Sequence, residues 1–216
     1  MPYKFKFQID GDDFFTAKLI SQQCSANCKN GNRCRKQVVI GLPYCYVHLL
    51  SIKHLRIKES TIANAGNGLF TQNKSAGEND IIYKKGETIG EYLGEYLNLN
   101  TMNERYAYEE GNTAPYAVEI TDDTLFIDAS LYRSYPSIIN HSNTPNQINV
   151  KFNNPNRRVQ PNTIKMVATK NIRNNTELFA NYGRQYHFQN NHQTVKSRNY
   201  PEAYNKMMPE EKKSEA

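Results

Sequence analysis

The sequence contains no tryptophan and no long apolar run, although it is 216 residues long. A membrane-spanning helix needs roughly 18 or more consecutive apolar residues, and no stretch of this chain approaches that length. The first residues, Met1 to Phe7, also lack the apolar core of a secretory signal. We therefore expect a protein of the intracellular, reducing compartment that makes no membrane contact.

Cysteine is scarce, and all of it lies near the N-terminal end. The four cysteines are Cys24, Cys28, Cys34 and Cys45. His48 follows the last of them, and the absence of cysteine beyond that point excludes a cysteine-rich metal site in the rest of the chain. Four thiolate or imidazole groups form a tetrahedral site for Zn²⁺, whereas disulfides are rare in a reducing compartment. Residues 23–50 are thus predicted to be a zinc-binding module, and metal binding would supply the folding free energy of so short a segment.

Five residues compete for four coordination positions in this module. The order Cys-x3-Cys-x5-Cys-x10-Cys-x2-His resembles a short Cys-x9-Cys-x10-Cys-x2-His appendage of viral and microbial proteins. That resemblance implies one structural zinc ion held by Cys24, Cys34, Cys45 and His48, with Cys28 as an alternate ligand. The basic residues between the cysteines suit either contact with nucleic acid or docking on the main domain. These residues are Lys29, Arg33, Arg35 and Lys36.

Acidic residues are in deficit over the whole chain. It has 27 lysines and arginines against 21 aspartates and glutamates, which gives a net charge of +6 and an isoelectric point near 9.0. A basic protein of this kind suits an acidic partner such as nucleic acid or chromatin. The length is sufficient for one domain with a sizeable core and a smaller appendage.

Short alternating or β-branched segments, separated by turn residues, predict many short strands. We expect strands at residues 3–7, 52–58, 81–83, 87–97, 115–120, 124–129 and 164–168. Two segments predict helices. One is 12–20, which begins near two aspartates, and the other is 98–113, where Thr101 and Glu104 form a capping box. Together these elements predict a mainly β, α+β architecture of several small sheets.

Four motifs occur in a fixed order along the chain. They are Ala65-Gly66-Asn67-Gly68-Leu69-Phe70, Ile89-Gly90-Glu91-Tyr92-Leu93-Gly94-Glu95, Ile139-Asn140-His141-Ser142 followed by Pro145-Asn146, and Glu177-Leu178 followed by Tyr182-Gly183. Each alone is a weak signal, and the polar stretch 140–146 by itself is either a surface turn or a packed polar site. In register, the four resemble a SET-domain protein lysine methyltransferase in its short, viral form.

The resemblance divides the chain and implies its fold. It covers roughly residues 52–188, with an insert near 98–113. Residues 1–22 would be an N-terminal extension, and residues 189–216 a C-terminal lid segment and flexible tail. The implied fold has small curved sheets and a C-terminal pseudoknot, in which the segment ending at Tyr182 threads the loop that carries Asn140 and His141.

The resemblance also implies a cofactor and site residues. The cofactor is S-adenosylmethionine, and its implied binding residues are Gly66, Asn67, Gly68, Asn140, His141, Tyr182 and Phe188. The implied catalytic residues, which line the lysine channel, are Tyr182, Tyr116 and Tyr186. The reacting lysine must be neutral, which costs about 4.6 kcal/mol at pH 7 for an amine of pKa about 10.4. An aromatic channel would lower this cost, because desolvation disfavours the charged form.

The predicted function is therefore methyl transfer to a lysine of a basic protein. The expected substrate is a histone tail or a viral or host equivalent, and the expected location is nuclear chromatin, a viral factory or a virion. The alternative is a SET-like binding module without turnover, whose basic zinc appendage binds nucleic acid or a protein partner. The presence of Asn140, His141 and Tyr182 together favours the enzyme.

Overall fold

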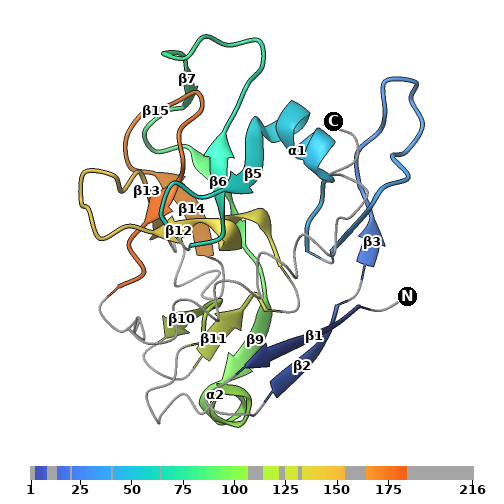
Figure 1. Ribbon diagram of the computed structural model, residues 1–216, viewed down its shortest axis with the longest axis vertical. Helices are drawn as coiled ribbons and strands as arrows, with labels where there is room; N and C mark the ends of the chain where they lie inside the picture. Colours follow the sequence, from blue (N-terminus) through green and yellow to red (C-terminus); the bar gives the residue numbers. More distant parts are fainter. Residues whose placement is uncertain are drawn as a thin grey trace. The chain divides into compact units, whose positions relative to one another are not determined.

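The computed structural model describes residues 3–8, 14–19, 21–39, 41–63, 65–106, 114–121, 125–130, 133–153 and 164–183. Within these residues the protein is mainly β, with short strands in several small sheets and few helices (Figure 1). The elements in chain order are β1 (Tyr3–Gln8), β2 (Phe14–Leu19), β3 (Ser21–Gln23), β4 (Gln37–Val39), α1 (Tyr46–Lys53), β5 (Leu55–Glu59), β6 (Asn67–Thr71), β7 (Ile81–Tyr83), β8 (Thr88–Tyr92), β9 (Glu95–Asn98), α2 (Leu99–Tyr106), β10 (Ala117–Thr121), β11 (Leu125–Asp128), the 3-10 helix η2 (Tyr135–Ile138), β12 (Asn140–His141), β13 (Val150–Asn153), β14 (Ile164–Ala168), β15 (Ile172–Arg173) and β16 (Phe179–Ala180). The predicted mainly β class is confirmed. Among the described residues, no helix is long and apolar enough to span a membrane.

The chain divides into two compact units, each built from separate segments. Unit 1 comprises Met1–Cys45, Gly94–Arg133 and Tyr186–Ala216, and unit 2 comprises Tyr46–Leu93 and Ser134–Gln185. The sheets of unit 1 are β1-β2, β3-β4 and β10-β11-β9, and those of unit 2 are β5-β6, β13-β14-β8, β15-β7 and β12-β16. Among the described strands, all pairs are antiparallel except β12 with β16.

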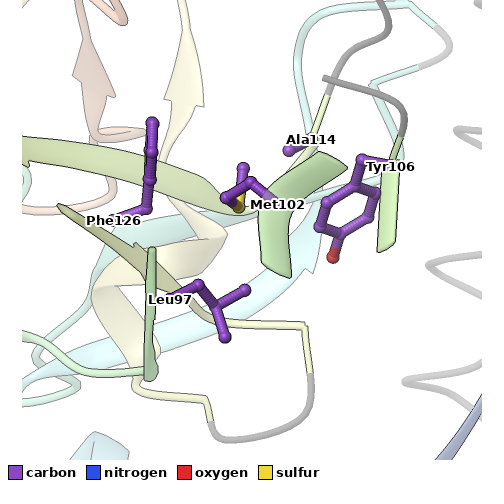
Figure 2. Close-up of a cluster of buried hydrophobic side chains, with 5 residues drawn as sticks. All are labelled: Leu97, Met102, Tyr106, Ala114 and Phe126. Atoms are coloured by element: carbon purple, nitrogen blue, oxygen red, sulfur yellow. The ribbon is translucent and has the colours of Figure 1, made fainter. Parts of the chain in front are cut away.

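An apolar cluster joins α2 to the three-stranded sheet of unit 1. Figure 2 shows its members, Leu97, Met102, Tyr106, Ala114 and Phe126. Met102 and Tyr106 are four residues apart and therefore lie on the same face of the helix. Leu97 comes from β9 and Phe126 from β11, where both are buried. The amphipathic face of α2 is thus what attaches the helix to the sheet.

A buried acid ties the same helix to β11. Asp128 is fully buried. Its Oδ2 accepts hydrogen bonds from Arg105 Nη1 and from the Tyr106 hydroxyl, both at 2.7 Å, and its Oδ1 accepts from the Ser130 backbone N–H at 2.9 Å. Arg105 also pairs with Glu95 at 2.8 Å. Burial and the nearby Asp128 charge raise the pKa of Tyr106, so this hydroxyl stays a donor at neutral pH.

In unit 2, large apolar side chains from most of the strands form the core. The fully buried ones include Leu55, Leu69, Ile89, Met166, Ile172, Leu178 and Val150. The parallel pair β12–β16 sets Asn140 opposite Phe179 and His141 opposite Ala180. The C-terminal motif therefore lies beside the loop that carries Asn140 and His141, as the predicted fold requires.

Three predicted elements differ from the structure: the helix at 12–20, the start of the strand at 52–58, and the strand at 87–97, which is two strands, β8 and β9. Residues 12–20 were expected to be helical, but Phe14–Leu19 forms β2, which pairs with β1 along its whole length. So short a segment gains little as an isolated helix, whereas pairing satisfies the backbone groups of both strands. The predicted strand 52–58 is helical at its start, because α1 extends to Lys53. His54, with φ of 52°, separates α1 from β5.

The predicted helix 98–113 exists, but a different residue caps it. The side-chain oxygen of Asn98 accepts the Thr101 backbone N–H at 2.9 Å and the Thr101 hydroxyl at 3.1 Å. This is the contact of an N-cap with the third helical residue, so the helix starts before the predicted capping box. Its described part ends at Tyr106, and residues 107–113 lie outside the described residues.

Candidate active site and metal centre

One buried carboxylate connects the turn between β5 and β6 to the C-terminal motif. Glu177 is 5% exposed. Its Oε1 accepts from Ser60 Oγ at 2.6 Å, and its Oε2 accepts from the backbone N–H and the hydroxyl of Thr61 at 2.7 and 2.6 Å. Asn140 Nδ2 lies 3.4 Å from Oε1. Buried carboxylates require such donors, so Glu177 holds three separate parts of unit 2 in one arrangement.

Strand β6 passes this carboxylate so closely that only glycine fits at its second position. A Cβ on Gly68 would lie 2.1 Å from Glu177 Oε1 and 3.3 Å from Asn140 Nδ2. Gly66 has a different reason to be glycine, because its φ is 73°, in the region that favours this residue. The Gly-x-Gly motif thus has a packing function in this fold, and its predicted contact with a cofactor remains a prediction.

We expect Gly68→Ala to lower the free energy of unfolding by about 2 kcal/mol, because the added methyl group overlaps the Glu177 carboxylate. Gly77→Ala is the matched control, since a Cβ there would lie 3.6 Å from the nearest atom, Asp80 Oδ2. The control should stay within about 0.5 kcal/mol of wild type. Urea denaturation of both variants measures the difference, and equal stabilities would contradict this account of Gly68.

Asn140 presents an acceptor oxygen that the described part of the protein does not use. Its Nδ2 donates to the carbonyl of Asn67 at 3.1 Å and toward Glu177 Oε1. Both neighbours are acceptors, which fixes the orientation of the amide. Among the described residues no donor reaches Oδ1. An amide oxygen in this half-buried position is suited to accept a hydrogen bond from a ligand ammonium group.

His141 positions the main chain of Tyr182. Its Nδ1 accepts the Tyr182 backbone N–H at 3.0 Å, so Nδ1 carries no proton and Nε2 does. Nε2 is 3.0 Å from Asn143 Oδ1 and donates to it. Both ring nitrogens are therefore engaged inside the protein, which fixes the orientation of the imidazole ring beside Tyr182.

Tyr182 is held at both its backbone and its hydroxyl. The hydroxyl donates to the carbonyl of Ile139 at 2.5 Å, which fixes the direction of its O–H bond. The ring packs against His141 and Phe152, with centroid distances of 5.4 and 6.3 Å. Phe152 in turn contacts Tyr92 edge-on at 5.9 Å. Unit 2 thus holds the ring of Tyr182 among other aromatic rings and its hydroxyl against the Ile139 carbonyl.

Two residues of this site were not predicted to act in it. Asn149, which is 3% exposed, donates from Nδ2 to the Glu177 carbonyl at 2.8 Å and accepts the Phe179 backbone N–H at 2.9 Å. Glu177 was noted only as part of a motif. Both act on the segment that leads to Tyr182, so they are positioning residues.

The other predicted site residues are less closely defined. Tyr116 belongs to unit 1, where its ring lies under the Arg133 guanidinium at 4.7 Å and its carbonyl accepts the Ala129 N–H at 2.9 Å. Arg133 is 4% exposed, so this stacking is a fixed feature of unit 1. Tyr186 and Phe188 lie outside the described residues, and their roles stay predictions.

The predicted metal ligands come together. One ligand atom from each of Cys24, Cys34, Cys45 and His48 lies within 4.8 Å of all the others. Cys34 Sγ and Cys45 Sγ are 3.9 Å apart, close to the roughly 3.8 Å edge of a tetrahedron with Zn–S bonds of about 2.3 Å. That separation is too long for a disulfide, and none of the four cysteines forms a disulfide. The geometry therefore fits one tetrahedral metal ion.

Hydrogen bonding in the cluster favours the thiolate form of one cysteine. Burial raises the pKa of Cys34, but hydrogen bonds from the Lys36 backbone N–H and from neighbouring thiols outweigh burial and lower it overall. Cys28, whose side chain reaches Cys34, has a raised pKa through desolvation and the neighbouring thiolates. Cys28 is absent from the four-membered group, and its status as an alternate ligand stays a prediction.

The described fold and site correspond to a known domain. The family model of the SET domain matches residues 81–183, which span β7 to the end of the C-terminal motif. Residues 81–183, just under half of the chain, therefore match the SET domain, and a Cys/His cluster near the N-terminus can form a small zinc module. The predicted domain start at residue 52 stays a prediction.

Solved structures similar to this chain include assemblies of polycomb repressive complex 2. One is a humanized mutant of the Chaetomium thermophilum complex bound to the inhibitor GSK126, with 25% identity over 61% of this chain and a TM-score of 0.47. Another is ctPRC2 in an autoinhibited conformation bound to S-adenosylmethionine, with 28% identity over 61% of this chain and a TM-score of 0.46. A third is an active complex in the stimulated state, with 24% identity over 66% of this chain and a TM-score of 0.48. The matches cover 15%, 15% and 17% of those chains, respectively.

Proposed function

We propose that this protein is an S-adenosylmethionine-dependent protein-lysine N-methyltransferase. The observation that carries the proposal is the arrangement of Tyr182 within a SET domain. Its backbone N–H is held by His141 and its hydroxyl proton by Ile139. A tyrosine held in this way has a defined hydroxyl oxygen, which can accept a hydrogen bond from an amine and orient it.

The residues of unit 2 suit the proposed cofactor. Among the described residues, no donor reaches Asn140 Oδ1. This oxygen would accept a hydrogen bond from the α-ammonium group in the amino-acid part of the cofactor. The backbone at Gly66 and Asn67 and the ring face of His141 would complete the contacts. When bound, the cofactor would supply an electrophilic methyl group on a sulfonium. No side-chain base is required if the lysine enters the site neutral, as desolvation by aromatic groups favours.

We further propose that the substrate is a lysine on a basic protein, such as a histone tail or a viral or host equivalent. Tyr116 would line the lysine channel, and its stacking with buried Arg133 would keep its ring in place. Chromatin or another nucleic-acid-rich assembly would be the site of action. We also propose that one structural zinc ion is held by Cys24, Cys34, Cys45 and His48. The proposal is supported by their ligand atoms, which all lie within 4.8 Å of one another.

A comparison of methyl transfer by wild type and by the Tyr182→Phe variant tests the proposal directly. The wild-type chain should label core histones from radioactive S-adenosylmethionine. The variant should turn over about 100-fold more slowly, because it loses the oxygen that orients the amine. Tyr96→Phe is the matched control, since Tyr96 is 55% exposed, and it should keep full activity.

Each outcome of this experiment has one meaning. If wild type labels no protein among histones or a cell lysate and binds no S-adenosylmethionine, the enzyme proposal fails and the binding-module alternative replaces it. If Tyr182→Phe and Tyr96→Phe are equally active, methyl transfer stands but the assignment of Tyr182 is wrong.

A further inference from the structure

The positive charge of the protein is concentrated in one part of the chain. Residues 14–58 contain no aspartate or glutamate. They carry Lys18, Lys29, Arg33, Arg35, Lys36, Lys53, Arg56 and Lys58. Since the whole chain has a net charge of only +6, the remaining residues are net acidic. The basic character is therefore a local property, and it centres on the zinc-binding module.

Within the module, the charges lie on a well-defined loop at residues 27–36, called here the basic loop. The backbone N–H of Cys28 donates to the Asn32 carbonyl at 2.7 Å, and Gly31 N–H donates to the Cys28 carbonyl at 2.9 Å. Arg33 is used inside the module, where its Nε and Nη2 donate to the carbonyls of Cys24 and Gln23 at 3.1 and 3.3 Å. Lys29 and Arg35 are exposed on this fixed frame.

The side chains of the basic loop are of the kind that contacts phosphate. Asn27, Asn30 and Asn32 are exposed beside Lys29 and Arg35. Lysine, arginine, asparagine and backbone N–H groups are among the donors that contact the nucleic-acid backbone. Protein–protein interfaces instead centre on aromatic and apolar anchors, and residues 27–33 contain no aromatic or aliphatic side chain. The composition favours a nucleic acid over an acidic protein.

We propose that the basic loop binds the sugar–phosphate backbone of nucleic acid, with Lys29 and Arg35 as phosphate contacts. This site is separate from the SET domain and does not rest on the proposed methyl transfer. A basic substrate tail would be repelled by the loop, so the loop would instead hold the protein on the nucleic acid that accompanies such a substrate. Binding should be insensitive to base sequence, because backbone contacts carry no sequence information.

Binding of the full zinc-loaded chain to a fluorescent 20-base-pair DNA duplex tests the proposal. The binding constant is measured by fluorescence anisotropy at salt concentrations between 50 and 200 mM. Each lost phosphate contact reduces the slope of log K against log salt by about 0.9. The double variant Lys29→Gln/Arg35→Gln should therefore show a slope shallower by about 1.8 and affinity weaker by about tenfold or more. Lys74→Gln/Lys85→Gln, at exposed positions in unit 2, changes the net charge equally and should stay within about twofold of wild type.

Three results would overturn the proposal. One is no binding of the duplex by wild type at 50 mM salt. Another is an equal loss of affinity in the two double variants, which would make binding a matter of net charge alone. The third is displacement of the DNA by polyglutamate at equal charge concentration, which would assign the loop to an acidic protein. Because none of these measurements involves methyl transfer, they leave the proposed enzyme activity untouched.

Discussion

Replacing Glu177 with alanine will lower the free energy of unfolding by about 3 kcal/mol. A hydrogen bond to a charged group is worth about 1.5–3 kcal/mol, and each buried donor left without an acceptor adds a further cost. The substitution removes the acceptor of Ser60 Oγ and of both Thr61 groups. It also frees Asn140 Nδ2 from one of its two acceptors. Glu78→Ala, at an exposed position of the same unit, is the control and should stay within about 0.5 kcal/mol of wild type.

The same substitution should weaken cofactor binding under the proposed function. Asn140 Oδ1 is oriented only because Nδ2 is held by Asn67 and Glu177. Without Glu177 the amide can turn, so we expect affinity for S-adenosylmethionine to fall about tenfold or more, equivalent to about 1.4 kcal/mol. Calorimetric titration of the folded variant below its unfolding midpoint measures this loss separately from stability.

A double-mutant cycle makes the test sharper. Gly68→Ala is costly because its methyl group would meet Glu177 Oε1 at 2.1 Å. In the Glu177→Ala background that oxygen is gone, so the second substitution should cost less than about 1 kcal/mol, with a coupling energy in the range of contacting residues. If the two substitutions lower the free energy of unfolding independently, the methyl group at position 68 clashes with something other than Glu177. If Glu177→Ala is as stable as wild type, the hydrogen bonds of Glu177 do not stabilise the fold.

The sequence revealed the parts of the site that lie close together in the chain. Asn140 and His141 are adjacent, and Tyr182 lies in a short motif with Gly183, so each could be recognised from neighbouring residues. The members of the Cys/His cluster could be grouped for the same reason, because all of them lie within one short segment. Strands with strong alternation, such as β10, β11 and β14, were also placed correctly.

What could not be predicted depends on partners that are distant in sequence. Glu177 and Thr61 are 116 residues apart, and Asn149 joins a segment 28 residues away. A glutamate followed by the apolar run Leu178-Phe179-Ala180 was the one available signal of a buried acid. The helix predicted at 12–20 failed for a related reason, since pairing with β1 decides the conformation of Phe14–Leu19 and a local pattern cannot show it.

Loss of one member of the Cys/His cluster is also expected to have a large effect, on zinc content and on local stability. We expect Cys45→Ser to lose about one equivalent of zinc per chain, because a tetrahedral structural site does not survive on three ligands. In isolated zinc modules the metal supplies on the order of 10 kcal/mol of folding free energy, so residues 21–48 should also lose protection against amide hydrogen exchange. Both are measurable on the full chain, by atomic emission after dialysis and by mass spectrometry.

Cys28→Ser is the matched control, because it removes the same thiol from the same segment outside the four-membered group. It should keep about one equivalent of zinc and the exchange protection of wild type. His48→Ala should behave like Cys45→Ser, since its imidazole completes the four-membered group. Loss of zinc in Cys28→Ser together with retention in His48→Ala would exchange the two residues in the ligand set.

Retention in all three variants would mean that the cluster is a set of packed thiols. In that case burial of Cys24, Cys34 and Cys45, which are at most 4% exposed, would have to stabilise the module without metal.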